Sequence, residues 1–169
     1  MLRIELLSRS HDREGFSCGE PELDDYLKKT ARQHIDKGIS HTFVLVDGVE
    51  PLTILGFFTL TSCEVVTAEL PTEYARKYPR KAPDAKLARL AVATKQQQQG
   101  LGGLMLADAM WRTLSISENI GIIGFFVDAK NQDARDYYKQ YGFIPLPSYP
   151  LALFLPLATL AQAVAVLSR

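Results

Sequence analysis

A short apolar segment, a glycine-containing loop and a long helical pattern follow one another in the middle of the chain. Leu87–Val92 is typical of a buried strand, the loop reads Gln97-Gln98-Gln99-Gly100-Leu101-Gly102, and helical periodicity continues over Leu101–Leu114. Backbone N–H groups at a helix N-terminus attract anions, and glycine lets a phosphate approach the backbone closely. The glutamine side chains add further hydrogen-bond donors. This unit therefore indicates either a phosphate-binding loop or an ordinary tight turn.

The glycine spacing argues against the two commonest nucleotide-binding loops. No Gly-Lys-Ser or Gly-Lys-Thr follows, as a P-loop requires, and the pattern Gly-x-Gly-x-x-Gly is absent. ATP and NAD are therefore poor candidates for the ligand.

The segments on either side predict a mixed α/β fold. A chain of 169 residues with 47% hydrophobic residues is enough for one domain with a full core, and we expect it to span residues 1–169. The dipeptide Asp47-Gly48 predicts a tight hairpin. The patterns predict strands over Leu2–Leu7, Thr42–Val46, Leu52–Thr61 and Ile120–Val127, helices from Pro21 to Gly38 and over Asn131–Tyr141, an irregular surface segment over Pro71–Pro83, and two short strands within Phe143–Leu157.

Charge and cysteine content narrow the class of protein. Lysine plus arginine equals aspartate plus glutamate at 19 each, so no global field favours nucleic acid or an anionic membrane. Cys18 and Cys63 predict no disulfide framework, and the three histidines have no partner at ligand spacing, so no metal is expected. Charges within residues 1–5 argue against a signal peptide. These features favour a cytoplasmic protein.

The C-terminal segment leaves two alternatives open. Residues 151–167 are mostly apolar, but Pro156, Thr159 and Gln162 interrupt them, and the run is shorter than the roughly 20 residues of a spanning helix. We therefore favour a strand followed by a docked helix over a membrane anchor.

Two motifs resemble those of a known superfamily. The pattern Gln97-x-x-Gly100-x-Gly102 after Arg89-Leu90-Ala91-Val92 resembles the acetyl-CoA signature of the GCN5-related N-acetyltransferases (GNAT). Asp128–Asn131 and Tyr137–Phe143 resemble the superfamily's later motif. Segments near both ends, Phe16–Leu27 and Leu153–Leu157, are similar to the subfamily of bacterial GNAT toxins that acetylate the amino group of aminoacyl-tRNA. Such toxins are usually encoded beside a ribbon-helix-helix antitoxin.

This resemblance implies a fold, a cofactor and a set of residues. The implied fold is a single GNAT domain, whose central, mostly antiparallel sheet is splayed at the acetyl-CoA site near Leu87–Val92. The resemblance implies that acetyl-CoA contacts Leu90, Ala91, Val92, Gln97, Gln98, Gln99, Gly100, Leu101, Gly102, Gly103, Asn131 and Ala134. Two positions depart from the toxin subfamily, since Gln98 stands where glycine is common and Ala93 where aspartate is common. The first departure suggests an altered affinity for the cofactor.

Tyr138 is the candidate proton donor to the departing thiolate, because a phenol carries its proton at neutral pH and the family's matching tyrosine lies near the sulfur. The alternative is a core aromatic, since Tyr137 and Tyr141 are its helical neighbours. Acetyl transfer also needs amides that stabilise the oxyanion, a role that the resemblance gives to the backbone of Leu90–Val92.

The acceptor prediction relies on a local basic segment. Only Asp84 carries negative charge in the stretch of 14 residues that contains Arg76, Lys77, Arg80, Lys81, Lys86 and Arg89. A tRNA backbone would bind such a segment, although a solvated basic loop has the same composition. We therefore expect aminoacyl-tRNA as acceptor, an antitoxin as partner and a homodimer as the assembly. The alternatives are an acetyltransferase for a small amine or a protein N-terminus, and a CoA- or antitoxin-binding module without turnover.

Overall fold

The computed structural model describes residues 1–167, which form two compact units. Unit 1 comprises Met1–Thr61 and Ala88–Ala109, and unit 2 comprises Ser62–Leu87 and Met110–Arg169. The strands are β1 (Leu2–Leu6), β2 (His41–Asp47), β3 (Gly56–Val66), β4 (Lys81–Val92), β5 (Gly124–Asp128), β6 (Ile144–Pro145) and β7 (Ala152–Pro156). The helices are α1 (Pro21–Lys29), α2 (Ala31–Asp36), α3 (Thr72–Ala75), α4 (Leu101–Ser117), α5 (Gln132–Lys139) and α6 (Leu157–Leu167), with 3-10 turns η1 (Thr67–Glu69) and η2 (Thr94–Gln96).

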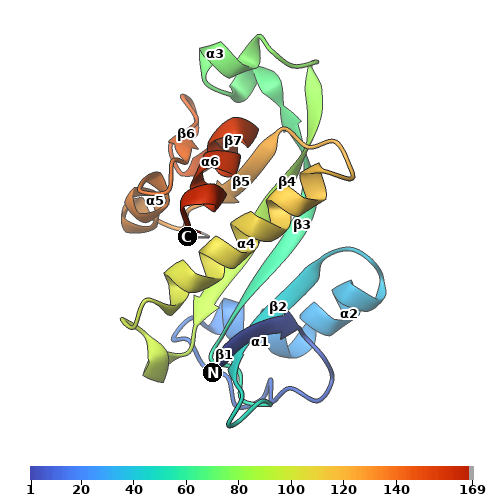
Figure 1. Cartoon of the computed structure of the whole chain (residues 1–169), viewed down its shortest axis with the longest axis vertical. Coiled ribbons are helices and arrows are strands. Elements are labelled where there is room, and N and C mark those ends of the chain that lie inside the picture. Colours follow the sequence, from blue (N-terminus) through green and yellow to red (C-terminus); the bar gives the residue numbers. More distant parts are fainter. Residues whose placement is uncertain (168–169) are drawn as a thin grey trace. The chain divides into compact units, whose positions relative to one another are not determined.

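The strands follow the order β1-β2-β3-β4-β5-β7-β6 in one seven-stranded sheet (Figure 1). The pairs β1–β2, β2–β3, β5–β7 and β6–β7 are antiparallel, whereas β4 and β5 run parallel. The register of this parallel pair extends from Ala85↔Phe125 to Leu87↔Val127, while β4 itself continues to Val92. The sheet is therefore mixed and mostly antiparallel, and its parallel pairing stops before β4 ends. This arrangement confirms the expected fold class.

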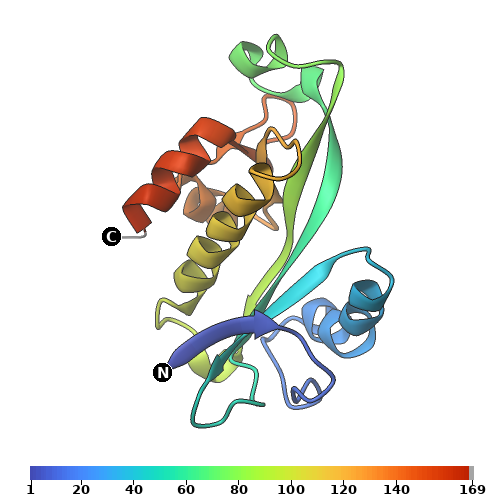
Figure 2. The same ribbon diagram turned by 45° about the vertical axis from the view of Figure 1, so that its right-hand side comes forward.

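In unit 1, α1 and α2 lie beside β2 (Figure 2). Tyr26, Leu27 and Ala31 are buried against Phe57 of β3 in this unit's core. The single helix predicted from Pro21 to Gly38 is divided at Thr30, which has φ −122° and serves as C-cap of α1 and N-cap of α2. A β-branched side chain loses freedom in a helix, so Thr30 leaves helical geometry at little cost.

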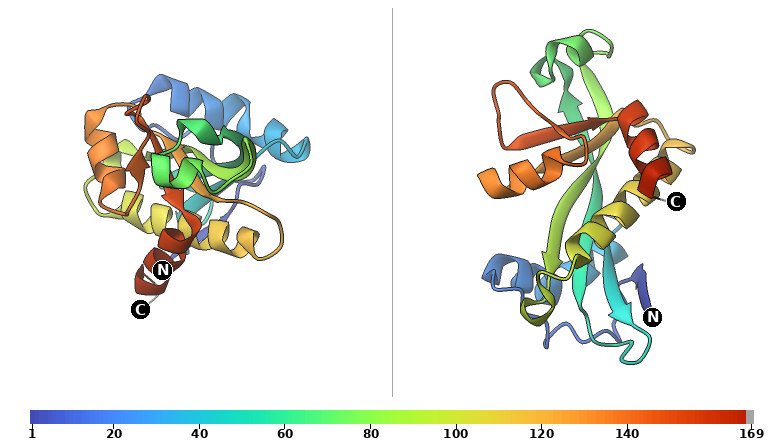
Figure 3. Two further views of the ribbon diagram at one scale, coloured as in Figure 1. Left: turned by 90° about the horizontal axis from the view of Figure 1, so that it is seen from above. Right: turned by 60° about the vertical axis from the view of Figure 1, so that its left-hand side comes forward.

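In unit 2, α6 packs on β5 and β7 (Figure 3). Leu160 and Val164 of this helix are buried. The docked helix predicted for the C-terminal segment is therefore confirmed. No helix within residues 1–167 is long and apolar enough to cross a membrane. Val65, Leu70, Leu146 and Phe154 form a hydrophobic cluster of buried residues in this unit.

Two predicted strands begin later than expected. The strand expected over Leu52–Thr61 begins at Gly56, because Leu52 and Thr53 pair with Asp12 instead of β2. The predicted tight turn forms at Asp47–Glu50, where the Glu50 N–H donates to Asp47 O at 3.1 Å, but Gly48 does not adopt positive φ. The two strands on either side, β2 and β3, are antiparallel as predicted. The strand expected over Ile120–Val127 begins at Gly124.

The segment Pro71–Pro83, expected to form no more than a helical turn or two, contains the four-residue α3, but it also contains the start of β4, which was not predicted. Proline is accepted inside β4 because Pro83 pairs through its carbonyl oxygen, which accepts a hydrogen bond from the N–H of Ile123 at 3.1 Å.

Candidate functional site

The glycine-containing loop of unit 1 adopts a conformation that exposes its backbone. Gln98 and Gly100 have φ of 64° and 77°, and α4 begins at the next residue, Leu101. Open space surrounds the position of a Cβ on Gly100, and the first turn of α4 carries no acidic side chain. Gly102 and Gly103 leave this turn without side chains. The loop and the 17-residue helix behind it therefore suit an anion such as a phosphate.

Gln97 supports the loop from within. Its Nε2 donates to the carbonyl oxygens of Val92 and Cys18, each at 3.1 Å. An amide has two such N–H donors, so both are engaged by the protein itself. Gln97 therefore joins the loop to β4 and to the segment before α1, and its contact with a ligand stays a prediction.

The end of β4 is held closely by its neighbours in unit 1. The N–H of Ala93 donates to Leu55 O at 2.8 Å, and Thr94 donates to Ser17 O through both its N–H and its hydroxyl. A Cβ on Gly56 would lie 2.9 Å from Ala91 O, so β3 approaches this strand more closely than a side chain permits. The roles of Gly56 and Ser17 were not predicted. Gly56 interrupts a β-rich run, which is a sequence signal for its role, whereas Ser17 has no such signal.

Tyr138 lies in α5 of unit 2 and is 8% exposed. Its ring makes edge contacts with Tyr137 and Phe143. Burial raises the pKa of Tyr138 to about 12, so the phenol keeps its proton at neutral pH and can act as a donor. Tyr138 is therefore a packed aromatic, and its role as proton donor stays a prediction.

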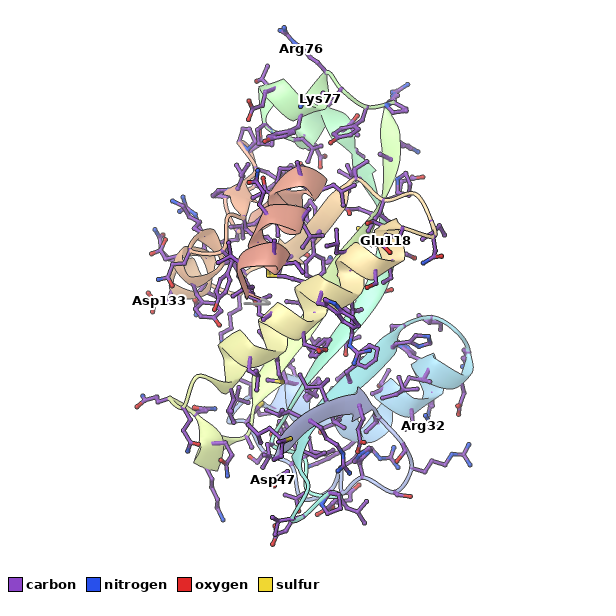
Figure 4. All side chains as sticks on the ribbon, in the orientation of Figure 1. Arg32, Asp47, Arg76, Lys77, Glu118 and Asp133 are labelled. Carbon is purple, nitrogen blue, oxygen red and sulfur yellow. The ribbon has the colours of Figure 1, made fainter. Side chains whose placement is uncertain are left out.

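Asn131 and Ala134 begin the same helix. The Oδ1 of Asn131 accepts a hydrogen bond from the Ala134 N–H at 2.9 Å and so caps α5. That contact occupies one acceptor of Asn131 and the N–H of Ala134, and it leaves the Asn131 side-chain NH₂ as the group that can reach a ligand. Asp133, labelled in Figure 4, is exposed in the first turn of this helix.

The predicted basic segment is divided between the units. Arg76 and Lys77 are exposed after α3, and Figure 4 shows the Arg76 side chain directed away from the ribbon. Arg89 belongs to unit 1, where its guanidinium lies 3.6 Å from the centre of the Tyr26 ring.

Two of the lysines have acidic partners. Lys81 Nζ lies 3.7 Å from Glu64, and Lys86 Nζ lies 2.6 Å from Asp128. Among the six cations of the basic segment, Arg76, Lys77 and Arg80 are exposed and form no salt bridge within residues 1–167.

The remaining candidate groups serve the fold. His11 is buried, its Nδ1 accepts from the Ser8 N–H at 2.9 Å, and its Nε2 lies 2.9 Å from Glu5. Desolvation raises the pKa of both cysteine thiols to about 11, which suppresses the nucleophilic thiolate. Within the described part of the chain, no three His, Cys, Asp or Glu side chains are grouped as a metal site would require.

Comparisons of this chain with known proteins agree on one family of relatives. The model of the acetyltransferase (GNAT) family matches residues 5–143. The tRNA-acetylating toxin of Mycobacterium tuberculosis is 38% identical over 150 residues, which cover 88% of each chain. The solved structure of AtaT complexed with acetyl-methionyl-tRNAfMet is 34% identical, with a TM-score of 0.86 over 100% of both chains.

A second AtaT structure, a mutant toxin bound to the C-terminus of the antitoxin AtaR and acetyl-CoA, is 31% identical. Its TM-score is 0.79, with 98% of this chain and 99% of that chain covered. Because the family model spans most of the sequence and a relative above 30% identity covers most of both chains, this chain belongs to the acetyltransferase (GNAT) family.

Proposed function

We propose that the chain transfers the acetyl group of acetyl-CoA to the amino group of aminoacyl-tRNA and thereby blocks translation, as the toxin of a toxin–antitoxin pair. Membership of the GNAT family gives the enzyme class. The main support for aminoacyl-tRNA as the acceptor is the full-length similarity to AtaT, which was solved with acetyl-methionyl-tRNAfMet. Acetylation removes the nucleophilic amine of the aminoacyl group, which explains why translation would stop.

Acetyl-CoA is proposed to lie along β4 and the loop that follows. The loop N–H groups of residues 97–103 would bind the pyrophosphate, and the backbone of Leu90–Val92 would bind the pantetheine arm and the thioester oxygen. Asn131 would contribute its side-chain NH₂ and Ala134 its small side chain. Support for this cofactor comes from the exposed backbone at Gln98 and Gly100 and from the AtaT structure with acetyl-CoA.

The proposed chemistry is a direct displacement. The neutral amine attacks the thioester carbonyl carbon, and a C–N bond forms as the negative charge on the carbonyl oxygen is stabilised by backbone N–H groups. The C–S bond then breaks, Tyr138 gives its phenolic proton to the thiolate, and the proton of the former amine returns to the phenolate through solvent. The high pKa of Tyr138 keeps this donor loaded before each turnover.

The tRNA backbone is proposed to contact the basic segment. Arg76, Lys77 and Arg80 are exposed and would bind phosphate directly. Lys81, Lys86 and Arg89 would first exchange the contacts that they make with Glu64, Asp128 and Tyr26. Because phosphate contacts release counterions, log K should fall with log salt by roughly 0.7–0.9 per contact.

Further partners are proposed by analogy. AtaT was solved with the C-terminus of its antitoxin AtaR, which supports an antitoxin for this chain. We expect this antitoxin to be a ribbon-helix-helix protein, the toxin to form a homodimer, and the reaction to take place in the cytoplasm, where tRNA is charged.

A direct assay tests the proposed function. The purified chain is incubated with labelled acetyl-CoA and a mixture of charged tRNAs, and the label on the aminoacyl group is measured. Label on aminoacyl-tRNA is expected. Label only on small amines or on peptide N-termini would transfer the proposal to those acceptors, and acetyl-CoA binding without thioester cleavage would indicate a binding module.

A further inference from the structure

Asp84 is an ionisable side chain buried inside the sheet. It lies in β4 of unit 2 and is 1% exposed. Its Oδ1 accepts hydrogen bonds from the N–H of Ala85 at 2.8 Å and of Gly124 at 3.0 Å. Its Oδ2 is also buried and has no hydrogen-bond partner in the part of the chain that the structure describes. A carboxyl group in this position is costly, so its retention needs a reason.

The contact to Gly124 lies where β5 begins. The N–H of Ile123 donates to Pro83 O at 3.1 Å, the N–H of Gly124 donates to Asp84, and the regular register starts one residue later at Ala85↔Phe125. A Cβ on Gly124 would collide with the carbonyl oxygen of Leu155 in β7. The first residue of β5 is therefore confined between Asp84 on one side and β7 on the other.

We propose that Asp84 is a positioning residue whose carboxyl group fixes the register of the parallel β4–β5 pair, and hence the residue after which these strands separate. The register ends at Leu87↔Val127, and the part of β4 beyond it contains Leu90–Val92. The consequence for catalysis rests on the proposed function, which assigns the thioester to that part. The register itself does not depend on it.

The electrostatic surroundings make this contact sensitive to pH. Burial raises the pKa of Asp84 to about 7, although the hydrogen bonds from the N–H groups of Ala85 and Gly124 lower it. Burial and the Asp84 carboxyl group raise the pKa of two neighbours, Cys63 of β3 and Tyr78 after α3, and Cys63 is in turn influenced by Lys86 of β4 and Asp128 of β5. The neighbouring β7 and α6 contain no titratable side chain.

Opening of the contact should therefore become easier as pH rises. When the strands part, water reaches the carboxyl group and its pKa returns towards 3.8, so the open form loses a proton that the closed form keeps. By linkage, opening is favoured increasingly up to about pH 7 and then reaches a plateau. Between pH 6 and pH 8 the opening equilibrium should rise roughly tenfold.

Amide hydrogen exchange of the full chain tests the proposal. The protection factors of Gly124 to Val127, corrected for intrinsic exchange, are measured at pH 6 and pH 8. In the wild type they should fall roughly tenfold. Asp84→Asn retains the oxygen acceptor and cannot ionise, so its protection should not change with pH. Asp84→Ala should reduce protection at both pH values.

The control is Asp128→Asn, which removes an exposed carboxylate from β5 and should leave the pH dependence as in the wild type. The proposal is overturned if Asp84→Asn loses protection with pH as the wild type does, or if Asp128→Asn abolishes that loss. If Asp84→Ala does not fold, the comparison of Asp84→Asn with the wild type still decides.

Turnover separates this inference from the proposed function. In an active enzyme, kcat of Asp84→Asn should be close to that of the wild type at pH 6, and the two should differ in their pH profiles. A wild type without turnover but with the expected exchange pattern would refute the function alone. An active wild type whose exchange does not depend on Asp84 would refute the positioning role alone.

Discussion

Tyr137 and Tyr138 are adjacent in α5 and have different surroundings. The hydroxyl of Tyr137 lies 3.4 Å from that of Tyr141, and burial together with this contact raises the pKa of Tyr137 strongly. For Tyr138, burial alone is the cause of the raised pKa. At the scale of single residues, this difference makes Tyr138 the better proton donor.

Tyr138→Phe should therefore lower kcat by roughly 10²–10⁴-fold while acetyl-CoA affinity stays nearly unchanged. Steady-state kinetics with aminoacyl-tRNA measures the first quantity, and a cofactor titration measures the second. Tyr137→Phe is the matched control and should have a much smaller effect. Equal losses in both variants would show that Tyr138 is not the donor.

Gln98 provides a second prediction at this scale, because it is the non-glycine residue with positive φ within residues 1–167. A side chain at φ 64° costs about 1 kcal/mol relative to glycine. Gln98→Gly should therefore raise the free energy of unfolding by roughly 0.5–1 kcal/mol in urea titrations. Gln99→Gly is the control and should destabilise instead, since Gln99 does not have positive φ. A loss of stability in Gln98→Gly would show that its side chain makes compensating contacts.

At the scale of elements, the N-terminus of α4 should account for cofactor binding. A ligand that binds only the folded state raises Tm by mass action, so acetyl-CoA should raise the Tm of this chain. Gly100→Asp should abolish the shift, because it places a negative charge beside the phosphate site and a side chain at φ 77°. Thermal denaturation with and without acetyl-CoA measures both effects. A shift in the variant equal to that of the wild type would place the cofactor elsewhere.

The α3–β4 segment should contribute tRNA affinity. Arg80→Ala combined with Lys81→Ala should raise KM for aminoacyl-tRNA, and each phosphate interaction that the variant removes should reduce the salt slope by roughly one unit. Acetylation of a small amine, which touches no phosphate, should be unchanged. Equal KM values for both proteins across low and moderate salt would exclude this segment as the tRNA surface.

At the scale of the whole molecule, Asp84 should shape the dependence of stability on pH. Its folded pKa of about 7 lies above the value of 3.8 for an unperturbed aspartate, so the folded state binds a proton that the unfolded state releases. The free energy of unfolding should therefore decrease as pH rises from about 4 to 7, by about 4 kcal/mol at most.

Urea denaturation across this range should show that decrease in the wild type and its absence in Asp84→Asn. Because other groups titrate as well, the difference between the two proteins is the relevant measurement. If the difference in free energy of unfolding between the wild type and Asp84→Asn does not change with pH, Asp84 is already ionised in the folded protein.

The sequence by itself determined the parts whose signals are local. Apolar periodicity and the glycines predicted the strand–loop–helix unit around Gly100. Gly142 has φ 100°, but α5 ends at Lys139 instead of at the predicted Tyr141. The two motifs identified the family, and the short C-terminal apolar run predicted the docked helix α6. Backbone propensity and side-chain spacing are properties of neighbouring residues, so they can be read without a structure.

Contacts between distant residues were decided by the tertiary structure. The hydrogen bonds from Gln97 Nε2 to the carbonyl oxygens of Cys18 and Val92 were not predicted, and Cys18 lies 79 residues away along the chain. Asp84 was recognised only as an acidic residue in a basic stretch, whereas the sheet buries it against Gly124, 40 residues away. Burial, desolvation and strand register depend on which segments pack together, and no local pattern encodes that packing.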